Sequence, residues 1–333
     1  MRPSKTLRKS WIDMSTAAVL KTILKCKSFI LSTHVNPDPD ALCSELALAK
    51  YLQSIGKRVR ILNEEEVPER FKFLPGSSML EKLPKTKDLS YDAAIIVDCG
   101  DLERIGKVQN VLNKLKPIIN IDHHVTNDLF GSLNLVKPKA SSAAEVLYDL
   151  FVQAKAKLTK DIAVLLYLGI MTDTGSFRYD NTTARVHEIV SRLLGDFQFS
   201  TSDLYKRLYE AIPVNDVALF TKAINKFDLL YGGKVVCVSL RKSLLKKFSA
   251  EVDLRDKIFS YLRMIKDVKA IVILTEFKND LTRANFRSQS EIDVAKIAAY
   301  FKGGGHKKAS GCVVEGDLRV AKIKILKQLE KVL

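Results

Sequence analysis

The chain reads FILSTHVNPDPDA from Phe29 to Ala41, an apolar run followed by one histidine and two aspartates set between prolines. The run at residues 29–31 is typical of a buried strand, and the chain beyond it suggests a ligand loop at the strand end. Each proline fixes its own φ and disfavours a helical conformation of the preceding residue. We therefore expect residues 34–40 to be extended, so that alternate side chains share one face. The side chains predicted on that face are His34, Asp38 and Asp40.

A second interpretation of this stretch requires no metal. A proline-punctuated turn can also lead into a helix whose first turn is capped by an aspartate, and Asp40 is a candidate for that cap. His34 favours the ligand loop, because imidazole beside carboxylates is a common ligand set for transition metals.

Short apolar runs alternate with amphipathic segments around this loop. A helix is expected at residues 41–55, where apolar side chains fall on one face and Gly56 is a plausible C-cap. Strands are expected at residues 29–31, 59–62, 93–97 and 118–121. Short Val- and Ile-rich strands separated by helices predict a parallel sheet that is buried on both faces.

Acidic or histidine residues follow three of these strands. Besides the first loop, Asp98 follows residues 93–97, and Asp122-His123-His124 follows residues 118–121. An isolated aspartate after a strand is more often a turn residue. However, ligands of open α/β sheets bind beyond the carboxyl ends of the strands, and a buried group of carboxylates repels itself unless cations neutralise it. We therefore predict a metal site at this edge.

The remaining pattern predicts a second, smaller α/β domain. Three helices are expected within residues 141–194, with residues 172–177 between the second and third, and a further helical region at 202–230. Then follow strands at 235–240, 268–276 and 282–286, a helix at 292–301, a glycine-rich turn at 303–306, a strand at 310–314 and a terminal amphipathic helix. We predict a domain boundary within residues 190–230.

The composition is that of a soluble globular protein, with 47% apolar and 28% charged residues over 333 positions. No apolar run approaches the roughly 18 residues of a membrane span, and no signal-peptide pattern follows the basic start, so we expect a cytoplasmic protein.

The five cysteines form no C-x-x-C pair and are interpreted as buried hydrophobic residues. A net charge of +16 favours an anionic partner, although a lysine-rich surface explains it equally well.

The turn Gly303-Gly304-Gly305 could form an anion-binding nest of backbone N–H groups, with donors from His306, Lys307 and Lys308 beside it. The alternative is a tight helix-to-strand connection with exposed lysines.

Taken in order, these motifs resemble those of the DHH phosphoesterase family. The motifs are His34-x-x-x-Asp38-x-Asp40, Asp98, Asp122-His123-His124 and Gly169-Ile170-Met171-Thr172-Asp173-Thr174-Gly175. The later segments Phe286-Arg287-Ser288 and Gly303 to Gly311 resemble the DHH-associated C-terminal domain, which closes over the substrate. The resemblance covers about Ile30 to Gly311, and the two-domain form is similar to the branch of oligoribonucleases (nanoRNases) and pAp phosphatases. It implies a metal-binding catalytic domain at 1–190, a helical linker at 191–230 and a substrate-binding domain at 231–333, with an active site in the cleft between the domains.

The resemblance also implies a cofactor of two divalent ions, Mn²⁺ or alternatively Mg²⁺. One ion would be held by His34, Asp38 and Asp98, and the other by Asp40, Asp98, His123 and Asp173, so that Asp98 bridges them. The catalytic residues would be this shared Asp98 and also His124, which would contact the scissile phosphate or the leaving oxygen. Alternatively, His124 orients the neighbouring site through a hydrogen bond.

The substrate-binding residues implied by the resemblance hold a terminal phosphate or nucleotide. They are Arg287, Ser288, Gly303, Gly304, Gly305 and His306. Where the family commonly has Arg-Ser-Lys, this chain has Gln289 after Arg287-Ser288, which leaves one phosphate contact open.

The implied reaction is hydrolysis of RNA of two to five nucleotides to mononucleotides, together with conversion of pAp to AMP as in a 3'(2'),5'-bisphosphate nucleotidase. A phosphodiesterase of linear dinucleotides such as pApA, or of cyclic dinucleotides, is the alternative. An inorganic pyrophosphatase is less favoured because of the glycine-rich turn. A non-catalytic basic nucleic-acid-binding protein is less favoured because it would not require the metal motifs. A homodimer is compatible with the sequence, which does not specify the oligomeric state.

Overall fold

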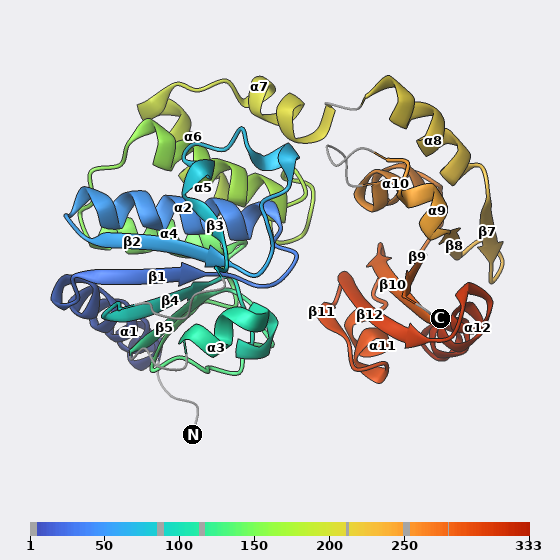
Figure 1. The fold of residues 1–333 in the computed structure, drawn as a ribbon, viewed down its shortest axis with the longest axis horizontal. Coiled ribbons are helices and arrows are strands. Elements are labelled where there is room, and N and C mark those ends of the chain that lie inside the picture. The colour runs from blue at the N-terminus through green and yellow to red at the C-terminus, as the bar shows by residue number, and fades with distance from the viewer. Residues whose placement is uncertain (1–4, 85–89, 113–116, 211–212, 249–253, 279) are drawn as a thin grey trace. The chain divides into compact units, whose positions relative to one another are not determined.

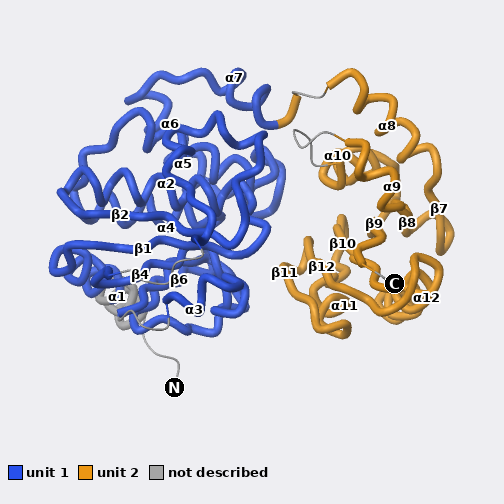
Figure 2. Tube along the Cα trace, viewed as in Figure 1, with its two compact units in different colours: residues 1–208 blue, residues 209–333 orange. Residues whose placement is uncertain are grey.

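The computed structural model describes residues 5–84, 90–112, 117–210, 213–248, 254–278 and 280–333, with side chains from residue 15 onward. The chain forms two compact units, unit 1 at Met1–Leu208 and unit 2 at Tyr209–Leu333 (Figure 2). The break between them lies inside the segment 191–230 that we predicted to link two domains; the predicted domain limits stay a prediction. Among the described residues, no helix is both long and apolar enough to cross a membrane.

Unit 1 is built on a six-stranded parallel sheet with the strand order β3-β2-β1-β4-β5-β6. The strands are β1 (Ser28–Ser32), β2 (Arg58–Asn63), β3 (Leu80–Lys82), β4 (Ala93–Val97), β5 (Ile118–Asp122) and β6 (Leu133–Val136). Strands β1 and β4 are buried along their whole length. The predicted parallel sheet with both faces covered is therefore confirmed at its centre. The short edge strands β3 and β6 were not predicted.

Helices cover both faces of this sheet (Figure 1). The helices of unit 1 are α1 (Lys5–Lys25), α2 (Pro39–Ser54), α3 (Gln109–Leu112), α4 (Ala143–Gln153), α5 (Lys160–Asp173), α6 (Ala184–Phe197) and α7 (Thr201–Tyr205). Helix α3 packs on one face, where Leu112 joins a core with Ile30, Ala94 and Ile96. Figure 1 shows α2, α4 and α5 on the other face. The predicted helices at 41–55 and within 141–194 are confirmed.

Unit 2 contains a mixed sheet with the order β11-β12-β10-β9-β8-β7, in which only β8 and β9 pair in parallel. Its strands are β7 (Phe227–Leu230), β8 (Val235–Leu240), β9 (Ala270–Lys278), β10 (Leu281–Ser288), β11 (Gly304–His306) and β12 (Ala309–Glu315). Its helices are α8 (Val214–Ile224), α9 (Lys242–Leu245), α10 (Leu254–Leu262), α11 (Val294–Tyr300) and α12 (Leu318–Leu329). Helices α11 and α12 cover one face, and α8 and α10 cover β8 and β9 on the other.

Two local predictions in unit 2 were wrong. Residues 227–230 form β7 and not the end of a helix, because Gly232 and Gly233 adopt positive φ and turn the chain back to pair with β8. The glycine-rich segment is not a turn of three glycines: Gly304–His306 form β11, which pairs with β12. The connection lies at Lys307 and Lys308, so a nest of successive glycine N–H groups is not formed there.

Candidate metal centre

The loop after β1 differs from the extended conformation that we predicted. Asn36 adopts a left-handed conformation with φ 53°, and Asp40 lies in the first turn of α2. The helix begins at Pro39 because proline is well suited to a first helical position. Asp38, and not Asp40, is its N-cap, accepting a hydrogen bond from the N–H of Ala41 at 3.0 Å. The loop thus combines the capping and ligand interpretations, since Asp38 caps the helix and also belongs to a group of potential metal ligands with His34 and Asp98.

Polar groups at the end of β2 and beyond hold this loop in place. Asn63 Oδ1 accepts a hydrogen bond from the N–H of Thr33 at 3.3 Å, and Glu65 Oε2 accepts one from the N–H of Asn36 at 3.1 Å. The N–H of Val35 donates to the carbonyl of Arg104 at 2.7 Å. We did not predict these supports. The only signal was a polar run, Asn63 to Glu66, following a strand at the same sheet edge.

His34 and His123 are buried and oriented in the same way. His34 Nδ1 lies 2.9 Å from the carbonyl oxygen of Val35, and His123 Nδ1 lies 3.4 Å from that of Ala140. Since a carbonyl can only accept, each Nδ1 carries a proton, and Nε2 is the ring atom that can offer a lone pair to a cation. Each Nε2 faces carboxylates, which is the arrangement of a metal-ligating histidine.

Asp98 lies between these two imidazoles. Its Oδ2 is 3.7 Å from His34 Nε2, and its Oδ1 is 3.4 Å from His123 Nε2. The residue follows β4 with φ 52° and is 2% exposed. Oδ1 is buried and, among the described residues, accepts no hydrogen bond of full geometry, His123 Nε2 and His124 Nδ1 lying 3.4 and 3.7 Å from it. A buried acceptor without a donor is costly, so this oxygen requires a cation or donor.

Among the described residues, the groups of potential ligand atoms include one of His34, Asp38 and Asp98, a second of Asp40, His123 and Asp173, and a third of Asp98, Asp122, His123 and His124. Within each group they lie within 4.8 Å of one another. His123 Nε2 is also 3.4 Å from Asp173 Oδ2. Two ligand atoms about 2.1 Å from a common ion lie roughly 3–3.5 Å apart, so these separations suit shared coordination. The residues present therefore fit divalent cations.

Asp40 is positioned by the start of α4 and by a glycine. Its two oxygens accept hydrogen bonds from the N–H groups of Ala143 at 2.7 Å and Ala144 at 3.1 Å. A Cβ on Gly169 of α5 would lie 2.5 Å from Asp40 Oδ1 and 2.7 Å from the Cβ of Ala144. Gly169 thus makes room for the carboxylate between two helices.

The electrostatics of the cluster also favour bound cations. Burial, together with the charges of Asp98 and Asp173, raises the pKa of Asp40 well above its ordinary value. Burial raises the pKa of Asp173 to about 7 against the charges of His123 and His124, which lower it, and the charges of Asp38 and Asp98 raise it further. Burial opposes a charge on His123, but Asp98 and Asp173 raise its pKa well above the ordinary value. A cation can replace the proton that such a cluster otherwise retains.

His124 lies next to this cluster but is held by a different partner. Its Nδ1 donates to Asp122 Oδ1 at 2.7 Å, and Asp122 also accepts from Asn127 Nδ2 at 2.5 Å. Burial would raise the pKa of Asp122, but the hydrogen bond and charge of His124 lower it below the ordinary value. Asp122 is thus an ionised carboxylate that fixes the His124 ring. We did not predict this contact or Asn127.

Glu45 is a second acidic residue that we did not predict. It is fully buried on α2 and accepts a hydrogen bond from Asn63 Nδ2 at 2.8 Å. Asn63 is the residue that also holds Thr33. Burial raises the pKa of Glu45 to about 8, outweighing Asn63 and His34, which lower it.

The pKa of Glu45 gives a prediction for stability. The folded protein holds this proton more tightly than the unfolded chain, whose carboxyl has an ordinary pKa of 4.5. Its stabilising contribution is therefore complete below about pH 4.5 and is lost as the pH rises toward 8. The unfolding free energy of Glu45→Gln minus that of wild type should therefore increase by about 1–3 kcal/mol when the pH is raised from 5 to 8.5. Urea unfolding in chelator at both pH values measures this, and a difference independent of pH would contradict it.

The predicted substrate-binding residues lie in unit 2. The guanidinium of Arg287 lies over the Phe259 ring at 4.8 Å and is 3.5 Å from Asp256. Ser288 points to the opposite, buried face, where its hydroxyl donates to the carbonyl of Ser290 at 3.0 Å. Gln289, which replaces the family's lysine, donates to the carbonyl of Val268 at 3.2 Å. Its side chain is thus engaged locally.

The predicted glycines have different surroundings. A Cβ on Gly303 would lie 2.3 Å from the carbonyl oxygen of Gly311, and Gly305 has φ 132°, so backbone packing explains both. Nothing lies within 4 Å of a Cβ on Gly304. His306 is the last residue of β11 and is partly exposed.

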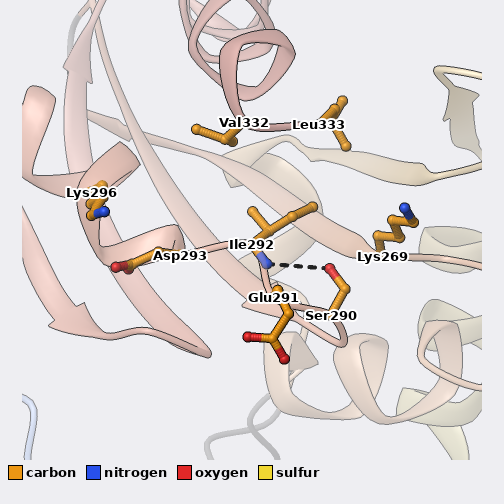
Figure 3. Close-up of a pocket in the computed structure, with 8 residues that line it drawn as sticks. All are labelled: Lys269, Ser290, Glu291, Ile292, Asp293, Lys296, Val332 and Leu333. Atoms are coloured by element: carbon orange, nitrogen blue, oxygen red, sulfur yellow. Dashed lines mark hydrogen bonds between the residues drawn. The ribbon is translucent and has the colours of Figure 1, made fainter.

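A cavity of about 440 Å³ also lies in unit 2 (Figure 3). It is lined by Lys269, Ser290, Glu291, Ile292, Asp293, Lys296, Val332 and Leu333. Acidic and basic side chains are mixed in this lining, and none of the predicted site residues belongs to it. It therefore adds nothing to the metal centre.

Both units match known family models. Residues 28–170 match the DHH family, N-terminal domain, and residues 231–333 match the DHHA1 domain. Together these segments include every residue of the metal cluster except Asp173, and all the predicted substrate-binding residues.

Similar proteins cover nearly the whole chain. The bifunctional oligoribonuclease and PAP phosphatase NrnA of Bacillus subtilis is 31% identical over 89% of this chain and 92% of that protein. The protein of the same name from Thermus thermophilus is 30% identical, over 90% and 89% respectively. A solved exopolyphosphatase-related protein from Bacteroides fragilis has a TM-score of 0.86 at 25% identity, and the match covers 96% of each chain.

Proposed function

The chain belongs to the DHH family, and we propose that it is a divalent-metal-dependent phosphoesterase that hydrolyses short oligoribonucleotides to mononucleotides and pAp to AMP. The proposal is supported by the names of relatives at 30–31% identity over most of the chain. The single observation that carries it is the cluster of histidines and aspartates around the buried Asp98.

We assign the metal ligands from the first two groups of donor atoms. His34, Asp38 and Asp98 hold one ion, and Asp40, His123 and Asp173 hold the other with Asp98 shared between them. Divalent ions bound there would neutralise phosphate oxygens and lower the pKa of an attacking water. The mixture of imidazole and carboxylate ligands favours Mn²⁺ as the ion. The backbone N–H groups of α4 and the carbonyl groups behind the histidines keep these ligands in place.

His124 is the group that we assign to the leaving oxygen. Its Nδ1 donates to Asp122, and we assign Nε2 as the ring atom that meets the substrate. A protonated Nε2 can donate to the departing oxygen, and the carboxylate of Asp122 stabilises the charge on the ring. Asp122 is a positioning residue in this scheme.

The test is one assay with several substrates. Metal-loaded protein is offered pAp, pApA, RNA of two to ten nucleotides and pyrophosphate, with Mn²⁺ or Mg²⁺. We expect turnover of the short RNAs and pAp, and loss of turnover in chelator that returns with metal. Turnover of pyrophosphate alone, or none on any nucleotide, would contradict the proposal. The same assay separates a dinucleotide phosphodiesterase from an enzyme that accepts the longer RNAs.

Arg287 is expected to bind a substrate phosphate, since a guanidinium suits bidentate phosphate recognition. Arg287→Ala should raise KM about tenfold or more and leave kcat nearly unchanged, because a ground-state phosphate contact is lost. Arg319→Ala, at an exposed position on α12, is the matched control and should behave as wild type. Steady-state kinetics on a diribonucleotide measure both. A fall in kcat at constant KM would refute the assignment.

A further inference from the structure

One short segment orients two of the three ligands that group around the same ion. We call residues 140–144 the support segment. The carbonyl oxygen of Ala140 lies 3.4 Å from His123 Nδ1, and two N–H groups at the start of α4 donate to Asp40 at 2.7 and 3.1 Å. The segment makes these contacts through its backbone, so its own position decides where the two ligands point.

The third ligand of this group, Asp173, is joined to the support segment by the side chain of Asn181. Asn181 Nδ2 donates to the carbonyl oxygen of Ser141 at 3.0 Å and to that of Asp173 at 3.1 Å. Carbonyl oxygens only accept, so both hydrogens of the amide nitrogen are used in these bonds. The amide thus links the support segment to the end of α5, where Asp173 is the last residue.

A turn with an unusual backbone follows α5. Gly175, Ser176 and Phe177 have φ angles of 58°, 59° and 63°, a conformation that residues other than glycine rarely adopt. Thr174 holds this turn: its carbonyl accepts from the N–H groups of the two residues after Phe177 at 3.0 Å, and its hydroxyl accepts from the N–H of Phe177 at 3.2 Å. Such strained turns persist where the surrounding structure fixes them, and they cluster at functional sites. Here the turn brings Asn181 back to the end of α5.

The ligands of the other ion have different supports. The loop that carries His34 is held by Asn63, Glu65 and the carbonyl of Arg104. These groups belong to the end of β2, the residues that follow it and the segment after β4. Their three hydrogen bonds involve neither the support segment nor the amide that links it to α5. A change in that amide should therefore act on one ion before the other.

We propose that Asn181 is a positioning residue for one ion alone, because its amide fixes Asp173 relative to the two ligands held by the support segment. This inference rests on the metal assignment in the proposed function, and it adds that the two ion sites are supported, and can be emptied, separately. We call the ions the His34 ion and the His123 ion, after one ligand of each. Asn181 acts through Asp173 and is not itself a ligand.

The test is the binding of Mn²⁺ to the metal-free full chain, measured by isothermal titration calorimetry. We expect wild type to bind two ions. In Asn181→Ala the His123 ion should bind about 10–100-fold more weakly, as is usual when a group that orients a metal ligand is removed, and the affinity for the His34 ion should stay within about twofold of wild type. Asn181→Leu, which has nearly the same shape but no donor, should show the same selective loss.

Anomalous diffraction shows which ion is lost. Crystals of Asn181→Ala are soaked at a Mn²⁺ concentration between the two dissociation constants of this variant. We expect a peak beside His34 and none beside His123, whereas wild type under the same conditions shows both. A role in folding alone would weaken both ions together, so this readout separates positioning from a general loss of structure.

Asn110→Ala is the matched control, because Asn110 is an exposed asparagine of the same unit on α3. It should bind both ions as wild type does. Thermal unfolding of the metal-free proteins checks that each variant is folded.

Equal weakening of both ions in Asn181→Ala, or unchanged affinity for both, would overturn the inference. So would full affinity of Asn181→Leu for the His123 ion, since the two hydrogen bonds would then be unnecessary. A protein that shows the selective loss but hydrolyses no nucleotide would keep this inference and refute the proposed function. Hydrolysis of short RNA by wild type, with both ions equally weakened in Asn181→Ala, would do the reverse.

Discussion

Replacement of Asp98 by alanine is expected to reduce turnover of a short oligoribonucleotide by well over 100-fold. Asp98 is the carboxylate placed between His34 and His123, at 3.7 and 3.4 Å, and is the ligand that we assign to both ions. Loss of a group that merely supports a ligand already costs about 10–100-fold, so loss of a shared ligand should cost more. Titration with Mn²⁺ should show that both ions are weakened together.

The fold of this variant should remain intact, because Asp98 follows β4 and the apolar core that packs on this strand is left unchanged. Asp196→Ala is the matched control, since Asp196 is an exposed aspartate of the same unit on α6. Circular dichroism and thermal unfolding verify folding, and initial rates across a range of Mn²⁺ concentrations measure activity. Substantial metal-dependent turnover by Asp98→Ala would exclude a bridging role.

A second large effect is expected when one methyl group is added to Gly169. Gly169→Ala should lower kcat by at least about tenfold and destabilise the protein by about 1–3 kcal/mol, as expected for overpacking. The added Cβ would lie 2.5 Å from Asp40 Oδ1, so the carboxylate must move away from its place at the start of α4. Helix propensity alone predicts the opposite sign, since alanine is favoured over glycine by about 1 kcal/mol within a helix.

The chain supplies an internal control for this prediction. Gly195 lies within α6, and a Cβ at this position would meet nothing within 4 Å. Gly195→Ala should therefore be neutral or stabilising and fully active. Urea unfolding and steady-state kinetics of the two variants are compared side by side. If both behave alike, Gly169 is not what positions Asp40.

The central sheet could be predicted because its strands are short, apolar and separated by turn signals. Residues 93–97 form a strand with the limits that we predicted, since all five side chains are buried and apolar. The same logic placed Asp98, Asp122 and His123 together, because parallel strands end at one edge. The conformation of the first loop was harder to predict. Proline restricts its neighbours in both interpretations, and only the structure shows that the helix begins at Pro39.

The supporting residues could not be predicted, because their roles come from contacts between distant segments. Asn63 reaches Thr33 and Glu45, and Gly169 faces Asp40 across more than a hundred residues of chain. Glu45 looks like a solvent-facing residue of an amphipathic helix, but α2 is buried nearly all round. Strand β11 was missed because three glycines favour a turn locally, whereas pairing with β12 decides its conformation.

The central claim is that the cluster around Asp98 holds a pair of divalent cations. Anomalous diffraction from a crystal of the wild-type protein grown with Mn²⁺ tests it most directly. We predict two peaks about 3.5–4 Å apart, one beside His34 and one beside His123, with Asp98 between them. Peaks located only elsewhere on the protein, or none in a crystal of fully active enzyme, would contradict it.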